Sequence, residues 1–171
     1  METVCRRFYK SPIGEIEITG AGKAILSVNF VKGKKEGSLR SPAEQKKYGG
    51  RSRNMPPAIK ECMKQLDEYF EGKRKTFKLK LRLPGTEFKN RVWKALLRVG
   101  YGETASYQDI ARAVGRPKAM RAVGNANRLN PVGIIVPCHR IIGSSGKLIG
   151  YGGGLWRKKW LLAHERRYSG S

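Results

Sequence analysis

A cysteine and a histidine stand side by side at the end of an apolar run. Pro137, Cys138, His139 and Arg140 follow the aliphatic residues 132–136, which fit a short buried strand. Because proline fixes its own backbone and restricts the residue before it, the thiol is held rigidly. Neighbours on an extended strand point to opposite faces, and most lone cysteines are small buried hydrophobes. Cys138 is therefore a candidate nucleophile that needs a partner.

The end of the chain supplies that partner. A predicted C-terminal helix carries an apolar stripe and ends in His164 and Glu165; the stripe consists of Leu155, Trp156, Trp160, Leu161 and Leu162. A free cysteine has a pKa near 8.5, so it needs a base to react at neutral pH. Cysteine, histidine and glutamate together would make an activated nucleophile. On the residues alone, Glu165 could equally be a solvated residue at a helix end.

Charge indicates the kind of substrate. The chain has 171 residues, with 36 Lys and Arg against 13 Asp and Glu, a net charge of +23 and a pI near 10.4. Residues 1–83 hold 20 basic and 9 acidic residues, and the rest hold 16 and 4, so both halves are strongly positive. Such a field attracts polyanions, of which nucleic acid is the commonest in cells. The alternative is a solvated, highly charged surface.

Several classes of protein are disfavoured. No apolar run reaches the length of a membrane helix, and residues 1–10 do not resemble a signal peptide. We therefore expect a soluble, intracellular protein with no membrane partner. The three cysteines, Cys5, Cys62 and Cys138, form no CxxC pair, and the chain has only two histidines. We expect reduced thiols and no metal site.

The first half predicts a small α+β domain over residues 1–83. Alternating apolar residues over 13–30 predict a hairpin that turns at Gly20 to Lys23. Residues from about 32 to 57 are rich in Gly, Ser, Lys and Arg and predict a mobile loop. A helix should then run from Pro56–Pro57 to Gly72, with Ile59, Met63, Leu66 and Phe70 on one stripe and Cys62 in or near the core. Residues 77–83 alternate as a strand would, and Pro84–Gly85 mark the domain boundary.

The second half, residues 84–171, predicts a mostly helical domain. Thr86 can cap a helix that Gly100 ends, and Ser106 with Asp109 has the form of a capping box. A further helix should begin at Pro117 and run to about Arg128. The two short helices suggest a helix-turn-helix, of the winged kind. The second helix offers Lys118, Arg121 and Arg128 beside small residues, which suits a DNA groove; the same small residues would also allow tight packing on a neighbour.

Five motifs in order now carry a family resemblance. They are Asn130-Pro131 with Ile134 to Arg140, Arg121-Ala122-Val123-Gly124, Ser106-Tyr107-Gln108, Tyr151-Gly152-Gly153-Gly154 and Leu161 to Glu165. From about Phe88 to Glu165 the chain resembles the O6-alkylguanine-DNA alkyltransferases, whereas the first half is only loosely similar. The resemblance implies DNA repair by stoichiometric, irreversible transfer of an alkyl group from O6 of guanine, and more weakly O4 of thymine, to a cysteine without a cofactor.

The resemblance also implies roles for individual residues. Cys138 looks like the alkyl acceptor, His139 the base that acts through a water, Glu165 the carboxylate that orients it, and Asn130 the brace of the active-site turn. Tyr107 looks like the residue that helps rotate the nucleotide out, and Arg121 the finger that fills the vacated stack. The residues that resemble the family's pocket for the flipped guanine are Tyr107, Ser144, Ser145, Tyr151, Gly152 and Gly153. DNA-binding positions are Tyr107, Gln108, Arg116, Arg121, Ala122, Gly124, Arg128 and Ser144.

The expected partner is double-stranded DNA containing O6-alkylguanine, bound by a monomer in the cytoplasm, or in the nucleus of a eukaryote. Family members often have serine at the place of Gly152, so a hydroxyl contact to O6 is missing here. Physical chemistry agrees, because an enzyme that acts on a base atom inside a duplex must flip the base out. A non-enzymatic damage-binding protein, a transcription regulator and a cysteine hydrolase remain as alternatives, and the presence of Cys138 argues against the first.

Overall fold

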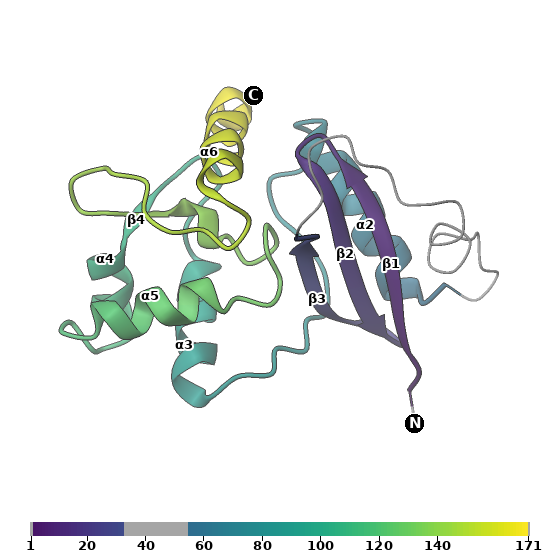
Figure 1. Ribbon diagram of the computed structural model, residues 1–171, viewed down its shortest axis with the longest axis horizontal. Coiled ribbons are helices and arrows are strands. Elements are labelled where there is room, and N and C mark those ends of the chain that lie inside the picture. Colours follow the sequence, from purple (N-terminus) through teal and green to yellow (C-terminus); the bar gives the residue numbers. More distant parts are fainter. Residues whose placement is uncertain (1, 33–54, 171) are drawn as a thin grey trace. The chain divides into compact units, whose positions relative to one another are not determined.

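The computed structural model describes residues 2–32 and 55–170. The chain divides into two compact units, Met1–Arg82 and Leu83–Ser171 (Figure 1). The mobile loop predicted for residues 32–57 lies, apart from its two ends, outside the described residues. The predicted class is confirmed: a sheet with a helix comes first, and a mostly helical part follows. No helix in the described ranges is long and apolar enough to cross a bilayer.

The first unit is a three-stranded antiparallel sheet covered by one helix. The strands β1 (Val4–Ser11), β2 (Gly14–Ala21) and β3 (Ala24–Phe30) pair in the order β1-β2-β3, and α2 (Pro57–Phe70) lies along one face of the sheet (Figure 1). The predicted hairpin and its turn are confirmed as β2 and β3. The sequence reasoning missed β1, because this edge strand buries only Tyr9 and shows no clear alternation of apolar residues.

Helix α2 packs its apolar face on the sheet. Ile59, Cys62 and Leu66 are fully buried, as predicted for a core stripe, whereas Met63 and Phe70 are only half-buried. Burial raises the pKa of Cys62 to about 12, so this thiol stays protonated. At Gly20 a Cβ atom would come within 3.0 Å of the Ile59 side chain. The absence of a side chain there lets the helix approach β2 closely.

The strand predicted for residues 77–83 is wrong. Only one parallel bridge forms, between Ile25 and Leu81, supported by hydrogen bonds from Ile25 N to Lys80 O (2.8 Å) and from Arg82 N to Ile25 O (2.9 Å). The buried side-chain amide of Gln65 forms hydrogen bonds with both backbone groups of Lys78. Lys78 N donates to Gln65 Oε1 (2.8 Å), and Gln65 Nε2 donates to Lys78 O (3.1 Å). A side chain has replaced the neighbouring strand as the hydrogen-bond partner.

The second unit is built around α3 (Glu87–Leu96), which packs against α4 (Tyr107–Ala113) and α5 (Met120–Arg128). Thr86 caps α3 as predicted, accepting a hydrogen bond from Lys89 N. Trp93 is buried between these helices, and its Nε1 donates to Ala126 O at 2.9 Å. A two-residue parallel pair, β4 (Ala105–Ser106) with β5 (Ile141–Ile142), and the last helix α6 (Leu155–Ser169) complete the unit (Figure 1).

The two short helices α4 and α5 follow one another as expected for a helix-turn-helix, but α5 begins three residues later than predicted. Pro117 occupies a turn that is closed by a hydrogen bond from Ala119 N to Arg116 O (2.9 Å). Proline suits the second position of such a turn as well as the first turn of a helix. The sequence could not separate these two uses. A wing beside these helices stays a prediction.

The buried strand predicted for residues 132–136 is also wrong. The segment is a pair of tight turns, with hydrogen bonds from Ile135 N to Gly133 O (2.8 Å) and from Val136 N to Val132 O (3.0 Å). Ile134 has φ of 69°, a strained value for a branched residue. The segment then enters a single 3₁₀ turn, η1 (Cys138–Arg140). The run is apolar because it is buried. Because η1 has three residues per turn, the side chains of Cys138 and His139 do not point to opposite faces as they would on a strand.

The capping box at the start of α4 yields a stability prediction. Ser106 Oγ accepts from Asp109 N (3.1 Å), while Asp109 Oδ2 accepts from Ser106 N (2.8 Å). Ser106→Ala should lower the free energy of unfolding in urea by about 1 kcal/mol, because it leaves a helix-end N–H without its acceptor. Thr104→Ala, at an exposed site two residues earlier, is the control and should change little. Equal losses in both variants would mean that the cap contributes nothing specific.

Candidate active site

Cys138 sits where the turns of residues 130–137 meet η1. The Asn130 side chain holds these turns together: Nδ2 donates to Val136 O at 2.8 Å, and Oδ1 accepts from Val132 N at 3.0 Å. Asn127, the last residue but one of α5, donates from Nδ2 to Cys138 O at 3.3 Å. Two buried amides therefore fix the backbone on both sides of the thiol. Asn130 has the bracing position that the sequence indicated, while Asn127 was not anticipated.

Glu165 is the hub of a buried polar cluster. The carboxylate is fully buried on α6, and its Oε1 lies 2.6 Å from His139 Nε2. Arg140 binds it with two nitrogens, Nε to Oε2 at 2.8 Å and Nη2 to Oε1 at 3.0 Å, and donates from Nη1 to Val99 O at 2.6 Å. Gly102 N adds a further donor at 3.2 Å. Arg140 was noticed in the sequence only as part of a motif, yet it is the charge partner that makes this buried carboxylate tenable.

The cluster sets the protonation of the histidine. Burial alone would raise the pKa of Glu165, but the hydrogen bonds and charges of His139 and Arg140 outweigh it and hold that pKa far below its usual range. Burial lowers the pKa of His139, despite the opposing effect of Glu165, so the ring is neutral at pH 7. An ionised carboxylate can only accept, so Nε2 carries the proton. The lone pair is then on Nδ1, which is buried and has no hydrogen-bond partner among the described residues.

The thiol itself is nearly enclosed. Cys138 is 6% exposed, and burial raises its pKa, although a hydrogen bond to the Asn130 side chain and the charge of Lys158 act in the opposite direction. The resting sulfur is therefore a protonated thiol at neutral pH. A nucleophile in this state needs a neighbouring base, and a neutral imidazole with a free nitrogen is the appropriate type.

Lys158 is a buried cation that sequence reasoning missed. Its side chain is 0% exposed, and Nζ donates to Ile149 O at 2.8 Å and to Gly150 O at 3.2 Å. The spacing of Lys158, Leu161 and Glu165 follows the helical period, which was the available signal. The predicted apolar stripe of α6 is correct at Leu161 but wrong at Leu155 and Trp156, which are 48% and 46% exposed.

Two predicted pocket tyrosines lie in the electrostatic neighbourhood of Cys138. Burial raises the pKa of Tyr151 well above its usual value, and the charge of Cys138 adds to that effect. The pKa of Tyr107 is likewise raised by burial and then by Cys138. The Tyr107 hydroxyl donates to Ile149 O at 3.0 Å. Two elements, the start of α4 and the segment before α6, thus contribute rings near the sulfur.

Most of the other predicted site residues are exposed, whereas Gln108, Gly124 and Gly153 are half-buried. The exposed ones are Arg116, Arg121, Ala122, Arg128, Ser144, Ser145 and Gly152. The Gln108 amide donates to Pro117 O at 2.9 Å, and Gly124 faces Tyr107, where an added Cβ would lie 3.8 Å from the ring. Their contacts with DNA or with a flipped base stay predictions. A serine would fit at Gly152, since a Cβ there would meet only Arg128 O, at 3.9 Å.

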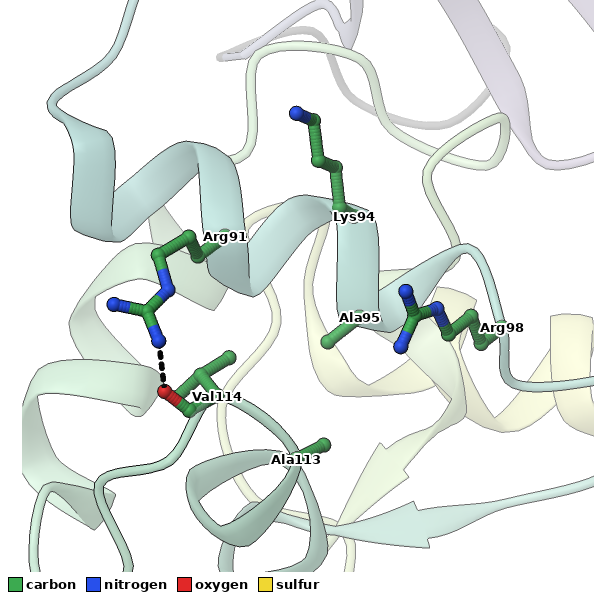
Figure 2. A pocket seen from close by; sticks show the side chains of 6 residues that line it. All are labelled: Arg91, Lys94, Ala95, Arg98, Ala113 and Val114. Atoms are coloured by element: carbon green, nitrogen blue, oxygen red, sulfur yellow. Dashed lines mark hydrogen bonds between the residues drawn. The ribbon is translucent and has the colours of Figure 1, made fainter.

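A shallow hollow elsewhere on this unit is strongly basic. A cavity of about 160 Å³ lies beside α3 and the end of α4, lined by Arg91, Lys94, Ala95, Arg98, Ala113 and Val114. Figure 2 shows Arg91 turned toward Val114, whose carbonyl accepts its hydrogen bond at 2.6 Å. The hollow contains no nucleophile or base, so we place the chemistry at Cys138 instead. Its three cations add to the positive surface.

Comparisons with known proteins cover nearly the whole chain. Residues 87–167 match the family described as 6-O-methylguanine DNA methyltransferase, DNA binding domain, and residues 4–83 match the ribonuclease-like domain of the same family. Methylated-DNA–protein-cysteine methyltransferases from Methanosarcina barkeri and Mycobacterium leprae are 46% and 48% identical, over 91% and 94% of this chain and 93% and 91% of theirs.

Solved structures agree. The O6-methylguanine methyltransferase of Mycobacterium tuberculosis superposes with a TM-score of 0.81 at 43% identity, covering 97% of this chain and 94% of that one. The same organism's enzyme in complex with DNA gives 0.80 at 42% identity, over 95% and 93%.

Removing the buried carboxylate should be costly. Glu165→Gln leaves Arg140 buried without its counter-ion, so the free energy of unfolding in urea should fall by about 3 kcal/mol or more at pH 7. The pKa of Glu165 is lower in the folded protein than in the unfolded chain. Ionised Glu165 therefore gives its full stabilisation above the unfolded pKa of about 4.3, and this stabilisation is lost as the pH falls through the folded pKa. The difference in the free energy of unfolding between Glu165→Gln and wild type should therefore become smaller below about pH 4. Glu87→Gln, at an exposed position, is the control; a loss as small as in that variant would refute a stabilising role.

Proposed function

The chain belongs to the 6-O-methylguanine DNA methyltransferase family, and we propose that Cys138 takes the alkyl group from O6 of a guanine in double-stranded DNA. The activity of the chain is direct repair of alkylated DNA by transfer to a protein cysteine. We propose that the chain acts as a monomer. The observation that carries the assignment of Cys138 is its place in η1, next to a neutral histidine held by a buried carboxylate.

The first step of the proposed reaction is loss of the thiol proton. His139 holds its proton on Nε2 toward Glu165, so Nδ1 is the nitrogen that can accept another, through a water, from Cys138. The imidazolium that forms faces an ionised carboxylate 2.6 Å away, which stabilises it. Arg140 keeps Glu165 ionised throughout. The triad therefore separates roles: Cys138 attacks, His139 takes the proton and Glu165 orients the ring.

The second step moves the alkyl carbon. The Cys138 thiolate attacks that carbon in line with its bond to O6; the new S–C bond forms while the C–O6 bond breaks, and the electron pair of that bond stays on the guanine. The guanine then takes up one proton. Because the thiol has lost one proton, the charges balance overall. The product is an intact guanine and an S-alkyl cysteine. A thioether is not hydrolysed under cellular conditions, so each molecule reacts once.

Cys138 lies within the protein, so the alkylated base must leave the duplex before it can reach the thiol. We propose that α5 binds the DNA, with Arg121 filling the vacated stack and Tyr107 assisting rotation. Arg121 and Arg128 are exposed on this helix, and the small residues Ala122 and Gly124 lie on it as well. Gln108, Arg116 and Ser144 would contact the DNA or border the pocket. The flipped guanine would occupy the space bordered by Tyr151, Ser145, Gly152 and Gly153.

Intact-mass analysis tests the acceptor. Incubation with duplex DNA containing one O6-methylguanine should add one methyl group to the peptide that contains Cys138, and repaired guanine should appear in equal amount. Cys138→Ala should abolish transfer and leave DNA affinity largely unchanged, because the thiol is buried and is not among the residues proposed to bind DNA. Cys5→Ser, in β1, is the matched control and should transfer normally. DNA binding by the wild type without any methyl transfer would favour a damage-binding protein instead.

The finger role of Arg121 predicts a substrate-dependent defect. Arg121→Ala should slow repair of duplex DNA by about tenfold or more, because unstacking a base costs a few kcal/mol that the inserted side chain helps to offset. Reaction with free O6-benzylguanine, which needs no flipping, should stay at the wild-type rate. Arg166→Ala, exposed on α6, removes the same charge elsewhere and is the control. Equal slowing with both substrates would disprove the finger role.

A further inference from the structure

The basic hollow beside α3 contains three cations that have no part in the active site. Arg91 and Lys94 lie three residues apart on α3, which places them on one side of the helix, and Arg98 follows in the turn that ends it (Figure 2). At about 1.5 Å per residue, Arg91 and Arg98 are separated by roughly 10 Å along the helix axis. We call these three residues the α3 row.

The α3 row keeps its positive charge. No carboxylate in the described ranges forms an ion pair with any of its three side chains. Arg91 Nη2 instead donates to a carbonyl oxygen, Val114 O, at 2.6 Å, as Figure 2 shows. A carbonyl oxygen supplies a dipole and no net charge, so the row still attracts anions.

The hollow leaves room for an anionic group between the cations. Its other lining residues, Ala95, Ala113 and Val114, have short side chains, and the cavity has a volume of about 160 Å³. The guanidinium of Arg91 is fixed by its bond to Val114 O, and its Nη2 would lie 3.7 Å from a Cβ atom added at Gly115. The hollow is therefore bordered by the turn that follows α4, and one of its cations is already oriented.

The turn after α4 also joins the hollow to the proposed DNA-binding surface. It leads from Val114 to Arg116, one of the proposed DNA-binding positions. The Arg116 guanidinium lies 5.7 Å from the centroid of the Phe88 ring, in the first turn of α3. Because α5 begins at Met120, shortly after this turn, Arg116 links the α3 row to the cations of α5.

DNA is the partner whose chemistry fits the α3 row. The residues that line the hollow all lie within residues 87–167, which match the DNA binding domain. Phosphates of one DNA strand repeat every ~3.4 Å along the helix axis, so a row of this length can meet more than one of them. A second copy of this chain is a poor alternative, because two molecules of net charge +23 repel each other.

We propose that the α3 row binds phosphates of the DNA backbone outside the flipped nucleotide and extends the DNA-binding surface of α5 along α3. This proposal rests on the proposed function, in which α5 binds the duplex. Contacts to phosphates carry no sequence information, so the row adds affinity for any duplex, damaged or undamaged.

The salt dependence of binding to undamaged duplex DNA tests the proposal. In Lys94→Gln/Arg98→Gln the slope of log K against log [NaCl] should become shallower by about 2, because about 0.9 is lost with each phosphate contact. The affinity at about 0.1 M salt should fall about tenfold or more. Arg91 is left in place, since its bond to Val114 O also supports the turn after α4. Unfolding in urea checks that the variant is folded.

Two matched variants separate direct contact from net charge. Lys159→Gln/Arg166→Gln removes two exposed cations from α6, makes the same change in net charge and should keep the wild-type slope. Lys94→Arg/Arg98→Lys retains both charges of the row and should keep it as well. An unchanged slope in Lys94→Gln/Arg98→Gln would overturn the proposal. An equal loss in the α6 variant would also overturn it, because DNA would then respond to net charge alone.

Neutral phosphates locate the contacts. In duplexes that each carry one methylphosphonate, replacing a phosphate that meets the α3 row should weaken binding by the wild type and have no effect on Lys94→Gln/Arg98→Gln. Phosphates elsewhere should affect both proteins alike. If every phosphate has the same effect on both proteins, the row makes no direct contact and the proposal is wrong.

A measurement on the wild type needs no variant. In the complex with undamaged duplex, an N-hydroxysuccinimide ester should acetylate Lys94 several times more slowly than in the free protein, as read from peptide masses. Lys159 should react equally fast in both. Equal rates for Lys94 with and without DNA would contradict the proposal. These experiments use undamaged DNA, so their failure would leave Cys138 as alkyl acceptor untouched, whereas absence of methyl transfer from O6-methylguanine DNA would refute the proposed function itself.

Discussion

A carboxylate buried without water must find its compensation within the protein, and the second unit is organised around that requirement at Glu165. Arg140 supplies the opposite charge, His139 and Gly102 supply further donors, and the result is an anion that stays ionised in the interior. These contacts connect α6 to η1, 25 residues earlier in the chain. Charge compensation therefore holds η1, the turn that contains Cys138, in place, and the same contacts keep the proton of His139 on Nε2.

Burial has opposite effects on the groups of the site, and the chemistry uses both. It raises the pKa of the Cys138 thiol and lowers those of the His139 imidazole and the Lys158 ammonium. At pH 7 the thiol and the imidazole are therefore neutral, whereas Lys158, with a pKa of about 8, stays mostly protonated. A protonated thiol is protected from indiscriminate oxidation, since the thiolate is the reactive species. Reactivity then depends on nearby charges and on a base that is neutral and ready to accept a proton.

Unlike the buried polar cluster around Glu165, the proposed DNA-binding surface is built from structure that short stretches of sequence determine. The capping box at Ser106, the turn at Pro117 and the small residues of α5 each follow from short-range preferences. The positive charge lies on exposed side chains that have no part in the core. This separation suits the proposed function, in which exposed charges bind the uniform DNA backbone and the enclosed sulfur of Cys138 carries out one specific step.

Short-range rules determined much of this protein from its sequence alone: the β2–β3 hairpin, the span of α2, the cap and start of α3, the cap of α4, the positive charge and, through the order of five motifs, the family. The sequence predicts the end of α3 at Gly100, whereas the helix ends at Leu96. Short-range rules failed where side chains take the backbone hydrogen bonds that a strand would need, and where buried charges find their partners elsewhere in the chain. The apolar run at 132–136 became turns because Asn130 takes its backbone bonds, and residues 77–83 are no strand because Gln65 binds Lys78. The roles of Arg140 and Lys158 were likewise hidden. Whether a charge can be buried depends on which groups from elsewhere in the chain surround it, and only the tertiary structure brings those groups together.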